Sequence, residues 1–297
     1  MDTSDWRVIG KRSRKLGPVW QVARYVGGVQ QTGYFKFPCK SNLRRVDSML
    51  ANELIAYELA KKLGVNVAEV DLTEVMGIRG IVSLVKPATA HYSWYQFSKK
   101  HKWSPFNQLK HPEQILRTFI FDIWICNVDR HSANLIVTTD GSTNNFYAID
   151  HGLSLLGALK WKGRQWNSNY WTHVNRYNVK YPKGLRGYIR SYHQLLPYIV
   201  EIENLPESCI ESIVDQVPSN LLSLHQKTII KNMLLSRRKS LRSIVRRWCI
   251  CQRKYRGHPP REEQASNELT SNEQIKKESP APDHTSEYDY DYYYYYE

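Results

Sequence analysis

The sequence predicts an α+β protein, and three features of the chain support this fold class. Alternating apolar and polar residues around Lys36 indicate a strand, and two short apolar runs between residues 135 and 149 indicate a hairpin. Residues 51–64 have the composition and the terminal glycine of a helix. With 297 residues the chain can bury one large core or two modest ones, so a two-lobed enzyme fits its length.

The first distinctive features are a glycine pair and a lysine strand. Gly27 and Gly28 separate extended apolar segments and predict a tight hairpin turn, which either covers nucleotide phosphates or is a plain connection. In YFKFP, Phe35 and Phe37 alternate with Lys36, so the lysine projects from the opposite face of the strand and can hold phosphates. The chain has no G-x-x-x-x-G-K-[ST] sequence, which argues against a P-loop enzyme.

The predicted helix over residues 51–64 supplies a partner for this lysine. Its apolar positions recur at i, i+4 and i+8, namely Ile55, Leu59 and Leu63. Glu53 lies on a different face and is the candidate to pair with Lys36, with Glu58 in reserve. A glutamate that only favours the positive end of the helix dipole is the alternative.

A second helix is predicted within the longest apolar run, residues 115–128, which Arg117 and Asp122 interrupt. Its apolar positions follow helical spacing: Leu116, Phe119, Ile120, Ile123 and Trp124. No run approaches the ~20 apolar residues of a membrane span, and the amino terminus lacks a secretory segment. Five cysteines without a C-x-x-C pair favour reduced thiols and a cytoplasmic protein.

The most informative segment, residues 127–152, contains NVDRHSANLIV and FYAIDHG. The spacing of Asp129 and Asn134 gives one carboxylate to orient an attacking hydroxyl and one amide oxygen to hold magnesium, and Asp150 completes the metal site. Asp and Asn are also common turn residues, so D-x-x-x-x-N alone is often structural. The second aspartate, at the mouth of an apolar strand, favours the functional interpretation.

A hairpin is expected to unite these residues. The apolar runs 135–137 and 146–149 predict its strands, TTDGSTNN its turn, and Asn134 and Asp150 then lie at the same end. Arg130 could pair with an acid or a phosphate, and His131 is interpreted as packing the loop. Both are left outside the catalytic set.

Taken together, YFKFP, NELIAYELAKKLG, NVDRHSANLIV and FYAIDHG resemble the bacterial HipA-like kinases and, more distantly, phosphatidylinositol kinases. The resemblance implies a bilobal protein-kinase-like fold, with a small β-rich N-lobe containing one helix and a larger, mainly helical C-lobe. It implies that ATP and Mg²⁺ bind between the lobes. On this resemblance Lys36 holds the phosphates, Glu53 anchors the lysine, Asp129 is the catalytic aspartate, and Asn134 and Asp150 carry the metal.

The resemblance covers about residues 20–155, with Asp-His-Gly where eukaryotic protein kinases have Asp-Phe-Gly. We expect an N-lobe over residues 1–86, a C-lobe over residues 87–258 and a disordered acidic tail over residues 259–297. The tail is rich in Pro, Glu, Gln and Ser, and it ends in a tyrosine run that is interpreted as a sticky segment. Residues 157–218 predict the loop-and-helix part of the C-lobe.

Charge is unevenly distributed along the chain. Residues 262–297 contain ten acids against two lysines, which is a net charge of −8. Because the whole chain has a net charge of +14, residues 1–261 carry +22. The segment Lys227–Arg256 contains no acid and predicts an amphipathic helix. Its apolar residues recur at helical spacing, apart from one interval of seven residues between successive apolar positions. It could meet nucleic acid, an anionic membrane surface or an acidic partner; a merely solvated face and the chain's own tail are alternatives.

The predicted function is that of an ATP-dependent kinase of HipA-like type, which transfers the γ-phosphoryl group to a Ser/Thr hydroxyl of a protein substrate. One alternative is a phosphatidylinositol-type lipid kinase whose basic helix docks on an anionic membrane surface. The other is a non-catalytic kinase-like module with a basic face for nucleic acid.

Overall fold

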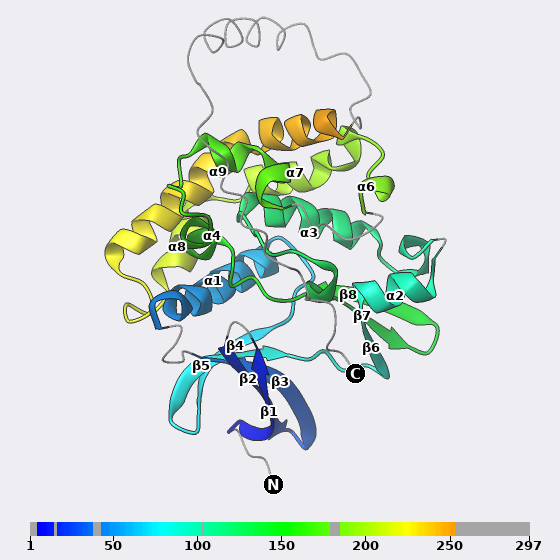
Figure 1. Cartoon of the computed structure of the whole chain (residues 1–297), viewed down its shortest axis with the longest axis vertical. Helices are drawn as coiled ribbons and strands as arrows, with labels where there is room; N and C mark the ends of the chain where they lie inside the picture. Colours follow the sequence, from blue (N-terminus) through cyan, green and yellow to red (C-terminus); the bar gives the residue numbers. More distant parts are fainter. Residues whose placement is uncertain (1–4, 15–16, 38–42, 103, 179–184, 253–297) are drawn as a thin grey trace, which may run out of the picture. The chain divides into compact units, whose positions relative to one another are not determined.

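The computed structural model describes residues 5–14, 17–37, 43–102, 104–178 and 185–252, which lie within one compact unit, residues 1–255 (Figure 1). The protein is α+β, as predicted: a β-rich amino-terminal sheet precedes a mainly helical part. The acidic tail over residues 259–297, predicted to be disordered, lies outside the described residues, and so do Cys39, Arg253, Lys254 and Arg256.

The amino-terminal sheet has the strand order β1-β2-β3-β5-β4, and every neighbouring pair is antiparallel. Its strands are β1 (Arg7–Arg14), β2 (Gly17–Val26), β3 (Val29–Lys36), β4 (Val70–Val75) and β5 (Ile78–Leu84). On β3 and just beyond it, Phe35 and Phe37 are buried in a small core with Trp6, Val22 and Val82. The predicted alternation around the lysine is therefore confirmed.

The Gly27–Gly28 pair forms a two-residue turn between β2 and β3, and both glycines have positive φ, as such a turn requires. The strand register pairs Val26 with Val29 at the turn but Val19 with Lys36 at the other end. At about 3.3 Å per residue, the glycines are roughly 25 Å along the strand from the lysine. The register therefore places the glycine turn at the far end of the strands from Lys36, which favours the plain turn, and contact of the glycines with nucleotide phosphates stays a prediction.

Helix α1 (Leu43–Lys62) begins earlier than predicted and ends as expected at its glycine. Gly64 has a φ of +61°, and the Val65 amide donates to the Ala60 carbonyl at 2.9 Å, which is the hydrogen-bond pattern of a Schellman C-cap. The three apolar positions predicted for this helix, Ile55, Leu59 and Leu63, are buried.

A second, three-stranded sheet has the order β6-β7-β8, from β6 (Ala90–Ser93), β7 (Leu135–Asp140) and β8 (Thr143–Ala148). The predicted hairpin is confirmed, but its turn is shorter than expected. Strand pairing continues to Asp140 and Thr143, which leaves only Gly141 and Ser142 to reverse the chain. Gly141 has a φ of +59°, a conformation that favours glycine.

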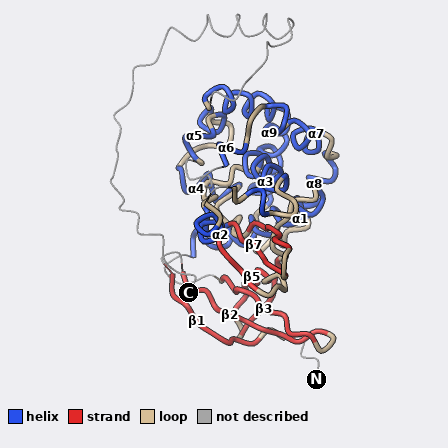
Figure 2. The backbone as a smooth tube through the Cα atoms, turned by 90° about the vertical axis from the view of Figure 1, so that its right-hand side faces the viewer, coloured by secondary structure: helices blue, strands red, loops and turns tan. Residues whose placement is uncertain are grey.

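Most of the remaining described chain is helical (Figure 2). The helices are α2 (Trp94–Lys100), α3 (Glu113–Trp124), α4 (Leu155–Lys162), α5 (Val174–Tyr177), α6 (Leu185–Tyr188), α7 (Leu196–Glu203), α8 (Glu207–Asp215) and α9 (Leu224–Cys251). Four short 3₁₀ turns lie in the described connections: Phe106–Gln108, Ser132–Asn134, Asn169–Thr172 and Tyr192–Gln194. None of the helices in the described ranges is both long and apolar enough to span a membrane.

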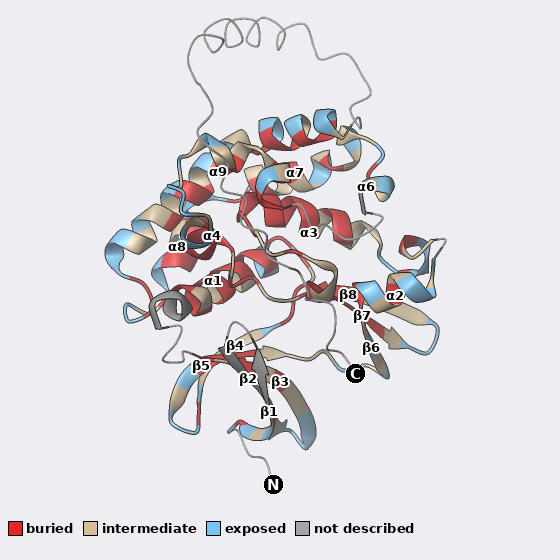
Figure 3. Ribbon diagram, viewed as in Figure 1, coloured by how far each residue is buried: buried red, intermediate tan, exposed pale blue. Residues whose placement is uncertain are grey.

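The large core extends from α1 through α3 to α9, as the burial pattern in Figure 3 shows. Helix α1 contacts α4 and α8 as well as β4, so it packs with the helical part rather than only with the amino-terminal sheet. A division of the chain at residue 86 stays a prediction. Helix α3 ends at Trp124, earlier than predicted, because the chain turns at Cys126, whose φ is +54°.

Candidate active site

Three charged side chains from distant parts of the sequence converge at one point. The Lys36 ammonium, at the end of β3, lies 2.8 Å from Glu53 Oε1 on α1 and 3.0 Å from Asp150 Oδ1 after β8. The Glu53 side chain is only 5% exposed, whereas those of Lys36 and Asp150 are 24% and 30% exposed. Glu53 therefore anchors the lysine from inside, and the open side of the cluster is formed by Lys36 and Asp150.

The proton affinities in this cluster follow from the same contacts. Burial alone would lower the pKa of Lys36, but the carboxylates of Asp150 and Glu53 outweigh it and raise that pKa above its usual value. Burial alone would raise the pKa of Asp150, but the Lys36 ammonium overrides it and lowers that pKa to about 2. The ammonium and the Asp150 carboxylate are thus both charged at neutral pH.

Helix α1 also holds the segment that carries Asp150. The Glu53 carboxylate accepts a hydrogen bond from the His151 amide at 2.9 Å, and the Asn52 side chain donates to the Gly152 carbonyl at 2.8 Å. Asp150 itself has a φ of +61°, which is uncommon for a residue with a Cβ. One turn of α1 therefore fixes both the lysine and the Asp-His-Gly segment.

The loop with Asp129 and Asn134 lies beside this segment. The side-chain Nδ2 of Asn134 donates to the backbone carbonyl of Asp129 at 3.0 Å. The backbone amide of Ile149 donates to the backbone carbonyl of Asn134, also at 3.0 Å. These bonds join the loop to the residue that precedes Asp150. His131 accepts a hydrogen bond from the Ala133 amide at 3.2 Å, as expected for a histidine that packs the loop.

A buried ion pair lies behind this loop, and sequence reasoning did not include it in the site. Arg130 Nε donates to Asp122 Oδ2 on α3 at 2.7 Å, and both side chains are fully buried. The signal was present, because Asp122 is the one acid in the predicted apolar helix and lies eight residues before the arginine. The Asn127 side chain also donates to Asp122, at 2.9 Å.

His151, the middle residue of Asp-His-Gly, is buried against this pair. Its Nε2 lies 2.8 Å from Arg130 Nη2. Burial and the Arg130 charge lower the pKa of His151 well below its usual value. The imidazole is therefore neutral, and Nε2 accepts from the guanidinium, because an arginine can only donate.

The oxygen atoms of the cluster fit a magnesium site of the kind that uses substrate phosphates. Mg²⁺ is usually held by one or two carboxylates together with phosphate oxygens. Asp150 supplies a carboxylate, and Asn134 supplies an amide oxygen whose nitrogen is already engaged with the loop. Within the described residues no group of three or more His, Cys, Asp or Glu could hold a metal without such help.

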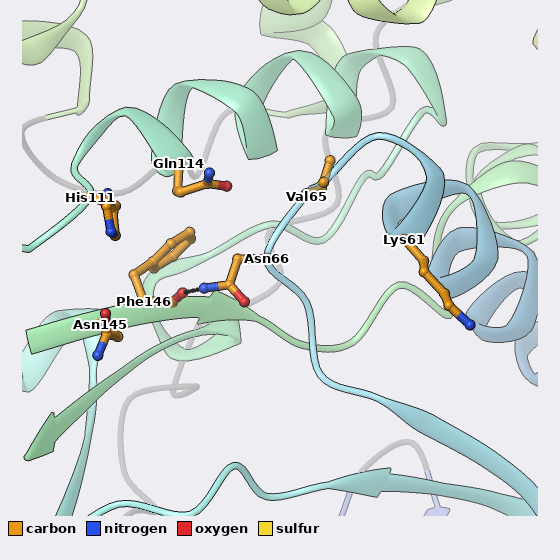
Figure 4. Close-up of a pocket in the computed structure, with 8 residues that line it drawn as sticks. Lys61, Val65, Asn66, His111, Gln114, Asn145 and Phe146 are labelled. Atoms are coloured by element: carbon orange, nitrogen blue, oxygen red, sulfur yellow. Dashed lines mark hydrogen bonds between the residues drawn. The ribbon is translucent and has the colours of Figure 1, made fainter.

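A separate cavity of about 310 Å³ lies away from these residues, at the carboxyl end of α1 (Figure 4). Its lining comes from α1 and the segment after it, the start of α3 and strand β8: Lys61, Gly64, Val65, Asn66, His111, Gln114, Asn145 and Phe146. The Asn66 side chain closes one side by donating to the Phe146 carbonyl. Because the cavity lacks the paired charges found around Lys36, we place the candidate active site at the charged cluster.

The predicted basic helix is present as α9, but its charges are largely engaged within the chain. The seven-residue step in its apolar spacing is filled by Arg237, which is buried and donates to the carbonyls of Ile123 and Trp124 at the end of α3. Arg242 forms an ion pair with Glu203 on α7, at 2.6 Å. The basic surface that the described part of α9 offers to a partner is therefore smaller than its number of basic residues indicates.

The fold that holds this cluster is kinase-like. A solved structure supports the fold: a proinflammatory kinase of Helicobacter pylori, CtkA, matches with a TM-score of 0.55 at 14% identity, over 82% of this chain and 94% of that chain. The sequence model of the HipA-like kinase family matches residues 36–174, just under half of the chain. This match confirms the resemblance to HipA-like kinases stated from the sequence.

Among the other solved structures that match is a toxin–antitoxin complex. It contains HipA of Shewanella oneidensis in complex with HipB and operator DNA, at 13% identity and a TM-score of 0.39, over 80% of this chain and 67% of that chain. No curated protein sequence matches the chain significantly.

Proposed function

We propose that the protein is an ATP-dependent kinase that transfers the γ-phosphoryl group to a Ser or Thr hydroxyl of a protein. The observation that carries this proposal is the convergence of Lys36, Glu53 and Asp150 beside the loop that holds Asp129 and Asn134. The match of residues 36–174 to the model of a kinase family supports it. The roles of the individual residues are part of the proposal.

In this proposal each side chain acts through position and charge, which supply most of the catalysis in phosphoryl transfer. Asp129 accepts a hydrogen bond from the acceptor hydroxyl and orients it. Lys36, kept in place by Glu53, neutralises charge on the phosphates, while Asn134 and Asp150 hold the metal. Magnesium-bound ATP, when present, supplies the phosphoryl group and a second positive charge.

Helix α9 supports a protein acceptor over a lipid. A helix that docks on an anionic membrane needs outward basic side chains. Here Arg237 is buried, and Arg238 and Arg242 bind Leu205, Glu207 and Glu203 of the same chain. This arrangement weakens the lipid-kinase alternative and the nucleic-acid alternative alike.

The test is mass spectrometry of the purified protein after incubation with MgCl₂ and ATP, alone, with a cell extract and with phosphatidylinositol vesicles. We expect phosphoserine or phosphothreonine on a protein, and none with Asp129→Asn. Phosphorylation of the lipid alone would replace the proposed acceptor. Unchanged turnover in Asp129→Asn would exclude the role of Asp129, and binding of ATP without any transfer would favour the non-catalytic module.

A further inference from the structure

One nitrogen of Arg130 joins the two segments that carry the predicted metal ligands. Its Nη1 donates to the Asn134 carbonyl at 2.8 Å and to the Ile149 carbonyl at 2.7 Å. The first carbonyl belongs to one predicted ligand residue, and the second belongs to the residue immediately before Asp150. A single planar group therefore sets how far apart the backbones of the two ligands lie.

The peptide groups on both sides of Asp150 are held from outside the segment. Arg130 binds the carbonyl of the preceding residue, Ile149, and Glu53 binds the amide of the following residue, His151. Asp150 has a φ of +61°, and such a conformation costs of order 1–3 kcal/mol in a residue other than glycine. It persists only where the surroundings impose it, and these two hydrogen bonds are the restraints on the two peptide groups next to Asp150 that come from Arg130 and Glu53.

Arg130 is itself fixed. Its Nε and Nη2 bind the two oxygens of Asp122 at 2.7 and 3.2 Å, and Nη2 also lies 2.8 Å from His151 Nε2. A planar guanidinium bound at both edges in this way cannot rotate without breaking several bonds, which a lysine ammonium could not reproduce. One rigid side chain thus fixes the position of the two predicted metal ligands relative to α3.

We infer that Arg130 is a positioning residue, which sets the spacing and backbone conformation of Asn134 and Asp150 by bridging the carbonyls of Asn134 and Ile149. This inference rests on the proposed function, because only that function gives Asn134 and Asp150 a metal to bind. Supporting groups around metal ligands typically change metal affinity or activity by about 10–100-fold when they are mutated. A purely structural buried ion pair would instead change stability alone.

The chain offers a chemically matched control. Arg117 on α3 also combines one carboxylate with two backbone carbonyls: its Nη1 donates to Leu63 and Gly64 at 3.0 and 3.2 Å, and its Nη2 pairs with Glu201 at 2.8 Å. None of these partners belongs to the proposed site. Arg117→Lys and Arg130→Lys therefore remove the same fork geometry in two different places.

The first measurement uses the protein without ligand, so that it does not depend on the proposed function. Hydrogen exchange is followed at the amides of Ile149 and His151, which are bonded to Asn134 and Glu53. We expect Arg130→Lys to speed exchange there by at least about tenfold and Arg117→Lys to leave it unchanged. Unchanged exchange in a folded Arg130→Lys protein, or equal acceleration in both variants, would overturn the inference.

The second measurement titrates MgCl₂ against binding of a non-hydrolysable ATP analogue. Arg130→Lys should need roughly tenfold more Mg²⁺ while its metal-free nucleotide binding, which depends on Lys36, stays the same. A wild-type Mg²⁺ dependence would contradict the inference. If the wild-type protein bound no nucleotide, the proposed function would fail, and exchange would still decide whether Arg130 fixes the segment. If Arg130→Lys does not fold, Asp122→Asn, which loosens the guanidinium without removing it, takes its place in both measurements.

Discussion

The charged cluster around Lys36 and the basic helix α9 use charge in opposite ways. In the cluster, three charges that are far apart in the sequence come from β3, α1 and the segment after β8, and two of them, Lys36 and Asp150, form its open side. In α9, basic residues that are adjacent in the sequence diverge around the helix, and several bind carbonyls or acids of neighbouring helices.

The difference shows that a high density of charged residues along the sequence is a poor indicator of a functional site. Convergence of charged side chains from separate elements is a better one. A run of arginines on a helix points in many directions, so its members can each satisfy a different structural need. Charges brought together from separate elements repel or attract strongly at short range, and the fold must compensate for holding them there. We expect substitutions in the cluster to change activity and substitutions in α9 to change stability.

The largest effect is expected for Asp150→Asn. The substitution removes the carboxylate that faces Lys36 and is proposed to bind the metal, so transfer should fall by at least about 10³-fold, or roughly 4 kcal/mol. Rates of phosphate transfer with saturating MgCl₂ and ATP measure it. Asp215→Asn, at an exposed ion pair with Lys231 on α9, is the control and should keep wild-type activity. Comparable activity in the two variants would remove the functional distinction between the regions.

The next effect lies in α9 and concerns stability. Arg237→Met leaves the Ile123, Trp124 and Trp171 carbonyls without their buried donor, so the free energy of unfolding should fall by about 3 kcal/mol. Urea denaturation measures the change. Lys239→Met, on the exposed side of the same helix, should stay within about 0.5 kcal/mol of wild type. Equal losses in both variants would mean that burial does not separate the roles of these basic residues.

Much of the site could be predicted because its signals are local. The alternation around Lys36 and the spacing from Asp129 to Asn134 are properties of short segments, and the structure brings Lys36, Glu53 and Asp150 together. The fold class and the hairpin followed from periodicity in the same way. The chemical role of each residue stays a prediction until activity is measured.

The remaining features depend on register and on long-range packing, which no local pattern contains. The Gly27–Gly28 turn satisfies every rule for a hairpin, but only the pairing of Val19 with Lys36 reveals that it lies at the far end of the strands. Asp122 and Arg130 were visible as charges, but their meeting depends on how α3 enters the loop. Arg237 interrupted a pattern, and only the structure shows that it binds the end of α3.

A smaller effect is expected for Glu53→Gln in the cluster. The amide has one accepting oxygen, so it can keep the hydrogen bond from Lys36 or the one from the His151 amide but not both, and it loses the charge. Because Asp150 still attracts the lysine, kcat should fall by about tenfold, or ~1.4 kcal/mol. Steady-state kinetics with ATP as the varied substrate measure it. Glu58→Gln, the reserve candidate on the same helix, is the control and should be unchanged. An unaltered kcat in Glu53→Gln would show that the buried anchor does not contribute to turnover.

The smallest effect is expected for Arg242→Gln on α9. Its pair with Glu203 is short, at 2.6 Å, but the arginine side chain is 51% exposed, and exposed pairs contribute about 0.2–1 kcal/mol. A double-mutant cycle with Glu203→Gln in urea should therefore give a coupling below about 1 kcal/mol that shrinks as salt is added. The distance resembles that between Lys36 and Glu53, so geometry alone does not distinguish the two pairs. Because water and salt screen the pair on α9, whereas Glu53 is buried, a larger or salt-independent coupling would mean that exposure does not separate the two regions.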